Sequence, residues 1–376
     1  MRFPEFSGEW TKIKLGDLGS FFSGGTPSSS RKDFYGGEIP FIRSGELHSD
    51  STALSITKEA YDSCSAKMVN KGDLLLALYG ATSGDISISR ISGAINQAIL
   101  CIRPQYMDAY FIKSLWEKHK RHILETYLQG GQGNLSSEII KNISFFFPNS
   151  DEQVKISRLI HIIDDRIETQ SKIIEELTDL RSALIEKCAK QSGNCISLSD
   201  ILREVEERST TANQYQVLSS TVKGIFSQKE YFNKDIASED NKGYKVVRKG
   251  HIVLSPQNLW MGNINYNDRF DIGIVSPSYK VFSIKEGFNP IFIAALLQTK
   301  KALNEYMLAS EQGASIVRRN LNIEAFMAIK FRIPDARQQD SLSMAITAIN
   351  AKLNNERCYL EQLTMQKSCL LENMFI

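Results

Sequence analysis

The sequence lacks the residue patterns by which most enzymes are recognised. It contains no G-x-x-x-x-G-K-[ST] phosphate-binding loop, no G-x-G-x-x-G run, and no NPPY- or DPPY-type motif of an amino-methyltransferase. His119 and His122 lie three residues apart on an expected helix, but no cysteine, histidine or acidic cluster completes a metal-binding set. We therefore expect a chain that carries no catalytic residues and no metal.

Cysteine pairs, long apolar runs and net charge are also scarce. The six cysteines show no C-x-x-C spacing, which favours reduced thiols in a cytoplasmic protein over a zinc site. No apolar run approaches the roughly 18 residues of a membrane span, and the first residues do not resemble a signal peptide. Because the formal net charge is only +2, any nucleic-acid-binding surface must be local.

The chain does contain a long internal duplication. The segment Pro148–Cys188 is matched without a gap by Pro334–Met374, 186 residues later. Apolar residues recur in both segments at alternating steps of four and three, which is the spacing of a coiled-coil seam. We predict two long helices over 148–192 and 334–376. The predicted seam residues are Ile156, Ile160, Ile163, Ile167, Ile174, Leu177, Leu184, Leu342, Ile346, Ile349, Leu353, Leu360, Leu363 and Leu370.

Polar residues interrupt both seams at equivalent places. They are Gln170 and Arg181 in the first segment, and Glu356 and Lys367 in the second. A polar seam residue costs stability but fixes helix register and choice of partner. The other helix faces are charged, so we expect the acidic pairs Asp164-Asp165 and Glu175-Glu176 to be solvated. Each helix needs an apolar partner along its length, and its own repeat is the nearest candidate.

A globular segment precedes each long helix, and the two globular segments share an order of elements. Ile196–Ile201 repeats the pattern of Ile13–Leu18, and Lys249–Ser255 repeats that of Lys71–Ala77. Alternating apolar stretches predict short strands, and Asp108–Tyr127 has helical spacing. The expected fold class is α+β: two similar α/β domains, over 1–147 and 193–333, joined by two antiparallel coiled-coil helices with an internal pseudo-twofold repeat.

Polar and cationic side chains gather in the loops of both globular segments. Hydroxyls and cations suit phosphate contacts, and Gln or Asn can read adenine edges in the major groove. The candidate DNA-binding residues are Arg31, Lys32, Arg43, Ser44, Tyr79, Thr82, Ser83, Gln132 and Asn134 in the first segment, and Lys223, Gln257, Asn258, Trp260, Gln312, Arg318 and Arg319 in the second. Each residue alone is typical of any surface, but their recurrence at equivalent places favours DNA binding.

Several short segments, taken in order, resemble those of a known family. They are Trp10–Leu18, Ser23–Pro27, Ile39–Arg43, Lys71–Leu75, Gly131–Asn134 and Phe147–Gln153. With the duplication, they resemble the specificity (S) subunits of type I restriction-modification enzymes over essentially the whole chain. The second half departs from the pattern, because it lacks a clean G-x-T-P and has Arg337-Gln-Gln339 in place of a Glu-Gln pair.

The resemblance implies two target-recognition domains, each reading one half of a bipartite, asymmetric sequence in double-stranded DNA. It implies that the helix pair spaces these domains and docks two methyltransferase (M) subunits, with restriction (R) subunits in the full complex. S-adenosylmethionine, ATP and magnesium would then belong to partner subunits, and this chain would bind no cofactor.

Two alternatives remain open at this stage. One is a coiled-coil adaptor with two protein-binding domains and no DNA role. The other is a DNA-binding remnant without methyltransferase partners. A salt-dependent affinity for duplex DNA would separate the adaptor from the DNA-binding hypotheses.

Overall fold

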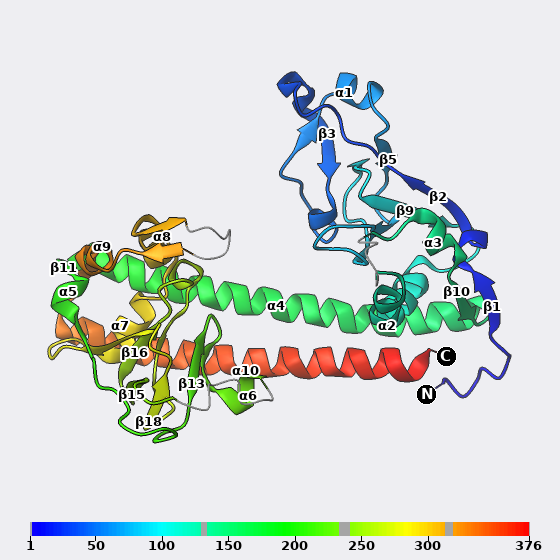
Figure 1. The fold of residues 1–376 in the computed structure, drawn as a ribbon. Coiled ribbons are helices and arrows are strands. Elements are labelled where there is room, and N and C mark those ends of the chain that lie inside the picture. The colour runs from blue at the N-terminus through cyan, green and yellow to red at the C-terminus, as the bar shows by residue number, and fades with distance from the viewer. Residues whose placement is uncertain (1, 129–133, 233–240, 313–318, 376) are drawn as a thin grey trace. The chain divides into compact units, whose positions relative to one another are not determined.

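Two compact units account for the chain in the computed structural model. The first unit comprises residues 1–171 and 359–376, and the second comprises residues 172–358. The structure describes residues 2–128, 134–232, 241–312 and 319–375. Each unit contains one globular domain together with part of both long helices, α4 and α10 (Figure 1).

The long helix α4 spans Ser150–Ser192, and α10 spans Ala336–Met374. Both begin with the same kind of cap. The Asn149 side-chain oxygen accepts a hydrogen bond from the Glu152 amide, and the Asp335 carboxylate accepts one from the Gln338 amide, both at 2.9 Å. Such caps satisfy backbone donors that the first helical turn leaves open. In the described ranges, no helix is both long and apolar enough to cross a membrane.

The predicted seam residues form an inward-facing stripe on each helix. The buried ones are Ile156, Ile160, Ile163, Leu342, Ile346, Leu353 and Leu363, and the half-buried ones are Ile167, Ile174, Leu177, Leu184, Ile349, Leu360 and Leu370. In the first unit the start of α4 shares a core with the end of α10, and in the second unit the end of α4 shares one with the start of α10. The two helices are therefore antiparallel within each unit.

The buried stripe moves by one residue near the end of each helix. Ile185 and Leu371, which are equivalent in the repeat, are 0% and 9% exposed, whereas the predicted Leu184 and Leu370 are only half-buried. A straight α-helix drifts by about 20° per heptad from a seven-residue repeat. Over the four heptads from Ile156 to Leu184 this amounts to nearly one residue step, which explains the change.

In its described residues, the first domain contains three sheets. The two-stranded sheet pairs β1 (Thr11–Lys14) with β10 (Ser144–Phe147). One four-stranded sheet has the order β2 (Gly19–Ser23), β9 (Ile99–Pro104), β6 (Leu74–Ala77), β7 (Ile86–Ile88). The other has the order β4 (Ser55–Ile56), β3 (Tyr35–Ile42), β8 (Gly93–Ile95), β5 (Lys67–Val69). The helices are α1 (Lys58–Asp62), α2 (Ala109–Tyr127) and α3 (Ser137–Asn142).

The second domain repeats part of this skeleton. Here β11 (Asn194–Ser197) pairs with β22 (Lys330–Ile333), and the four-stranded sheet has the order β12 (Leu202–Glu204), β19 (Lys280–Ile284), β16 (His251–Leu254), β17 (Ile264–Tyr266). The remaining strand pairs are β13 (Leu218–Thr221) with β14 (Gly224–Ser227), β15 (Lys245–Arg248) with β18 (Ile272–Val275), and β20 (Ser310–Gln312) with β21 (Arg319–Leu321). The helices are α5 (Leu198–Ile201), α6 (Gln228–Phe232), α7 (Pro290–Leu296), α8 (Lys300–Leu308) and α9 (Ile323–Ala328). Thus the central sheet is common to the two domains and the flanking elements differ.

A glutamine at the same place in each repeat anchors the globular domain to the long helix. Gln153 donates to the Pro148 carbonyl at 2.9 Å and accepts from the backbone of Asp108, the N-cap of α2, at 3.3 Å. Gln339 makes the equivalent bonds at 2.9 Å and 2.8 Å, to Pro334 and to Asn289, the N-cap of α7. The second half lacks the Glu-Gln pair but keeps the glutamine, as Gln339. The anchor is therefore present in both halves of the chain.

Candidate nucleic-acid interface

In the first unit, Tyr79, Thr82 and Ser83 lie in the tight turn that joins β6 to β7. The turn is closed by a hydrogen bond from the Gly84 amide to the Ala77 carbonyl at 2.8 Å. The Gly84 carbonyl accepts a hydrogen bond from the Trp116 indole at 2.8 Å, and this tethers the turn to α2. Gly80 and Gly84 both have positive φ, 88° and 78°, which glycine adopts without strain. The three candidate side chains are half-buried.

Asn134 lies close to the same turn, because the next residue, Leu135, is hydrogen-bonded to it. The Leu135 amide donates to the Leu78 carbonyl at 2.9 Å, so the exposed Asn134 follows the β6–β7 turn closely in space. Gln132 lies outside the described residues. The structure thus brings together Asn134 and the candidate residues of the β6–β7 turn, although more than 50 residues separate them in the sequence.

Arg31 and Arg43 lie on either side of β3 in the sequence, and both are paired with neighbouring acids. Arg31 contacts Asp33 at 2.5 Å and Glu59 at 3.4 Å. Arg43, which follows β3, contacts Glu46 at 3.1 Å. Both guanidinium groups therefore have carboxylate neighbours, and their contact with phosphate stays a prediction.

Lys32 and Ser44 are the other candidates from the same part of the first unit. Lys32 is exposed and makes no ion pair with any described residue. Ser44 is half-buried and opens the short helix Ser44–Glu46. Of the three predicted cations in the first unit, Lys32 is the one without an ion pair to a described residue.

The second unit has an equivalent turn after β16, which carries Gln257, Asn258 and Trp260. The Asn258 carbonyl accepts hydrogen bonds from Met261 at 3.1 Å and from Asn263 at 3.3 Å. Gln257 is exposed, whereas Asn258 and Trp260 are half-buried. The Asn258 side-chain oxygen is buried and receives no hydrogen bond from any described residue. A buried acceptor without a donor is unfavourable unless a ligand or water completes it.

Arg319 and Gln312 approach this turn in the way that Asn134 approaches its counterpart. The Arg319 amide donates to the Gln257 carbonyl at 3.2 Å, and Gln312 is directly opposite Arg319 in the β20–β21 pair. The Arg319 guanidinium donates to the carbonyls of Ser310 at 2.6 Å and Met307 at 3.2 Å, so its role is to cap the end of α8. Gln312 is exposed, and Arg318 lies outside the described residues.

Lys223 lies at the tip of the β13–β14 hairpin and is exposed beside Val222, which is 57% exposed. A buried polar cluster holds the hairpin in place. Ser220 donates to the Asn263 side chain at 2.8 Å, and the Asn265 side chain donates to Ser220 Oγ at 2.8 Å. The sequence analysis missed these two asparagines. The occurrence of Asn265 on strand β17, where asparagine is disfavoured, was the available signal.

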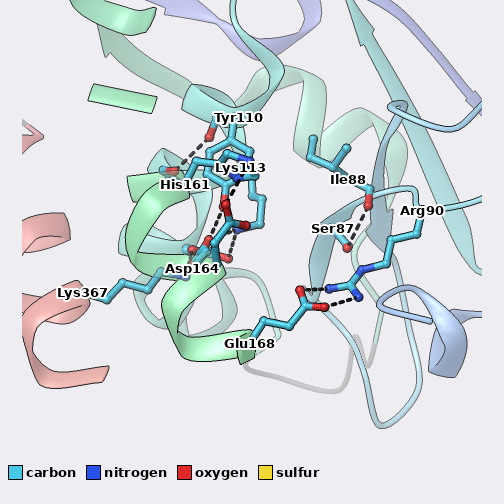
Figure 2. A network of polar contacts seen from close by, with 12 residues as sticks. Ser87, Ile88, Arg90, Tyr110, Lys113, His161, Asp164, Glu168 and Lys367 are labelled. Atoms are coloured by element: carbon cyan, nitrogen blue, oxygen red, sulfur yellow. Dashed lines mark hydrogen bonds and ion pairs between the residues drawn. The ribbon is translucent and has the colours of Figure 1, made fainter. Parts of the chain in front are cut away.

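A second site of polar contacts lies in the first unit, where α2 packs on α4 and α10. Lys113 contacts Asp164 at 2.9 Å, and Lys367 contacts Asp164 at 2.8 Å and Glu117 at 2.7 Å. Tyr110 also donates to Asp164. Figure 2 shows Tyr110 and Lys113 converging on Asp164, and nearby Arg90 paired with Glu168 at 2.7 Å.

This network corrects one expectation from the sequence. Asp164 is half-buried rather than solvated, because α2 covers its face of α4, whereas Asp165, Glu175 and Glu176 are exposed as expected. Lys367, an interruption of the seam, is the residue through which α10 joins the network. No group of three or more histidine, cysteine or acidic residues within the described ranges is placed to hold a metal ion.

The network predicts a pH-dependent contribution to stability. Burial alone would raise the pKa of Asp164, but the charge of Lys113 and hydrogen bonds from Lys367 and Tyr110 outweigh it and lower the pKa. A carboxyl with a lowered folded-state pKa stabilises the fold above its unfolded pKa of about 3.9, and this is lost as pH falls through the folded value. We expect Asp164→Asn to cost roughly 2 kcal/mol in the free energy of unfolding at pH 7 and progressively less below pH 4.

Denaturant unfolding at a series of pH values measures this effect. Asp165→Asn is the matched control, because Asp165 is adjacent, exposed and 3.7 Å from His161. It should change stability by less than about 0.5 kcal/mol at every pH. A penalty for Asp164→Asn that is equally large at low pH would contradict the role assigned to its charge.

The first half of the chain resembles a known protein family. Residues 7–179 match a family model described as the type I restriction modification DNA specificity domain. The MjaIX specificity subunit of Methanocaldococcus jannaschii is 28% identical over 183 residues, covering 45% of this chain and 42% of that protein. The HindI specificity subunit of Haemophilus influenzae is 26% identical over 188 residues, covering 47% and 40%. Each match therefore spans less than half of the relative's own length.

Among solved structures, a match extends over the full length. The S subunit of a type I restriction-modification system from M. genitalium aligns with 100% of this chain and 99% of its own, with a TM-score of 0.56 and 16% sequence identity. At this identity the likeness establishes the fold. It agrees with the predicted α+β architecture of two domains joined by long helices.

Proposed function

Residues 7–179 belong to the type I restriction modification DNA specificity domain family, and from this premise we propose that the chain is the non-catalytic DNA-specificity subunit of a type I restriction-modification enzyme. Each globular domain reads one half of a bipartite target in duplex DNA. The helix pair spaces the two half-sites and docks methyltransferase subunits. S-adenosylmethionine binding and base chemistry belong to those partners, and ATP and magnesium to the restriction subunits of the full complex.

One observation carries this proposal. In each unit a distant segment hydrogen-bonds to the turn after the equivalent central strand, through Leu135 to Leu78 at 2.9 Å in the first and Arg319 to Gln257 at 3.2 Å in the second. The same backbone arrangement presents different side chains in the two units. A common scaffold with two different surfaces is what an asymmetric, two-part target requires, since sequence is read by side chains at base edges.

The side chains of these turns suit direct reading of bases. Asparagine and glutamine bind adenine bidentately in the major groove, and Asn134, Gln257 and Gln312 are exposed. Lys32 and Lys223, which are exposed and make no ion pair with described residues, supply phosphate contacts that position the domains without specifying sequence.

Methylome sequencing tests this function. A host expressing the chain with the methyltransferase gene of the same locus should acquire N6-methyladenine in both halves of one bipartite, asymmetric motif. The matched control expresses the methyltransferase alone and should show no such motif. Two results together would contradict the DNA-specificity function: the chain expressed with the methyltransferase adds no methylation, and the purified chain shows no salt-dependent affinity for duplex DNA. The adaptor hypothesis would then stand.

A further inference from the structure

Two cations interrupt the helix seams at equivalent positions of the repeat. Each contacts a residue of the other long helix, and these two contacted residues are also equivalent in the repeat. In the first unit Lys367 of α10 contacts the Asp164 carboxylate of α4 at 2.8 Å. In the second unit Arg181 of α4 donates to the Asn350 side chain of α10, also at 2.8 Å. Asp164 and Asn350 are themselves related by the shift of 186 residues. The repeat therefore keeps the contact but replaces a carboxylate by a neutral amide.

The two cations differ in how their charge is compensated. Lys367 contacts two carboxylates, those of Asp164 and Glu117. Arg181 forms no ion pair with any carboxylate among the residues described. Burial lowers the pKa of Arg181, and the charge of Arg357 lowers it further. A partly buried cation that faces a neutral amide and a like charge is unfavourable in the isolated chain.

Arg357 adds a second unpaired cation on the same helix face. It lies seven residues beyond Asn350 on α10, two turns along one face, is exposed, and makes no ion pair in the described ranges. Guanidinium groups bind carboxylates through two parallel hydrogen bonds, which makes paired arginines suitable for an acidic side chain. The second unit thus presents two guanidinium groups that make no ion pair with a described residue.

We propose that Arg181 and Arg357 form a docking site for an aspartate or glutamate side chain of a protein partner that binds the helix pair in the second unit. This rests on the proposed function, in which methyltransferase subunits dock on the helices. A protein is favoured over DNA because Arg181 is flanked along the seam by the half-buried Leu177 and Leu184. The adjacent Leu180 is 55% exposed and offers a further apolar contact. A hydrated phosphate backbone gains nothing from such leucines, whereas arginine beside apolar side chains is typical of protein interfaces.

Substitution of Arg181 by methionine tests the proposal through two readouts that move in opposite directions. In the isolated chain, Arg181→Met should leave the melting temperature unchanged or raise it, because an uncompensated cation is replaced by an apolar side chain of similar length. In the complex, the affinity for the methyltransferase subunit co-expressed from the same locus should fall by about tenfold. Arg181→Lys keeps the charge but loses the bidentate geometry. Its affinity for the methyltransferase subunit should lie between those of the wild-type chain and Arg181→Met.

Arg203→Met is the matched control, since Arg203 lies on β12, is exposed and has no ion pair with a described residue. It should alter neither readout. A fall of several degrees in the melting temperature of Arg181→Met would show that the chain itself supplies the counter-charge, and would overturn the proposal. Unchanged affinity for the methyltransferase subunit would also overturn it, as would a loss confined to duplex DNA binding. A wild-type chain that binds no methyltransferase subunit would instead overturn the proposed function.

Discussion

Exchange of residues 1–147 for the first domain of another specificity subunit should change one half of the methylated target and leave the other half unaltered. The physical reason is that the β1–β10 pair brings the two ends of this segment together, with Thr11 opposite Phe147. All described turn residues of the first unit that we assign to DNA come from within this segment. The segment therefore carries its own reading surface, and both of its ends lie next to the start of α4.

The graft must keep the contacts that orient the domain on α4. These are the bonds of Gln153 to Asp108 and the pairing of Asp164 with Lys113. Methylome sequencing gives the result directly, and the reciprocal exchange of residues 193–333 is the control, which should change the other half alone. A graft that changes both halves would show that the two domains do not read independently.

Introducing a charge into the helix seam should have the largest effect on folding. Ile160 is 0% exposed and shares a core with Leu371 of α10. Ile160→Asp removes that apolar contact and buries an unpaired carboxylate, so we expect a loss of about 4 kcal/mol or more. The equivalent change in the second unit is Ile346→Asp, since Ile346 is also 0% exposed and packs in the core that contains Ile185.

The same helices provide matched controls for this experiment. Ile162, two residues from Ile160, is 44% exposed, and Met344, two residues from Ile346, is 69% exposed. Ile162→Asp and Met344→Asp should change the free energy of unfolding by less than about 0.5 kcal/mol. Thermal or urea unfolding measures all four variants. If buried and exposed substitutions cost the same, the helices do not pack through the seam that we describe.

The duplication and the long helices were predictable because they depend on local periodicity. A four-three spacing of apolar residues defines one helix face whatever the chain packs against. For the same reason the helix over Asp108–Tyr127 is confirmed as α2, with Asp108 as its cap. The buried strand β6 lies within Lys71–Ala77, one of the two segments whose pattern repeats. The position of the stripe at Ile185 and Leu371 was missed, because sequence spacing alone does not reveal how far a helix departs from an ideal heptad.

The candidate DNA-binding residues were predictable as a class but not as a surface. Polar residues at strand ends indicate loops, and this can be seen in the sequence. The residues that lie next to each loop in space come from distant segments, which the sequence does not reveal. The pairing of Asn134 with the turn at Leu78, and of Arg319 with that at Gln257, is created by the sheets. Arg31, Arg43 and Arg319 looked equivalent to Lys32 in the sequence, but nearby carboxylates or carbonyls occupy their guanidinium groups.

By itself, the sequence determined that the chain is a twofold repeat of a globular domain and a long helix, without recognisable catalytic motifs. Only the tertiary structure decided which charges are compensated. Lys367 and Arg181 are equivalent interruptions of the seam, yet one contacts two carboxylates and the other a neutral amide. The reason is that one of those carboxylates, Glu117, belongs to α2, a helix that reaches the seam only after the first domain has folded onto it.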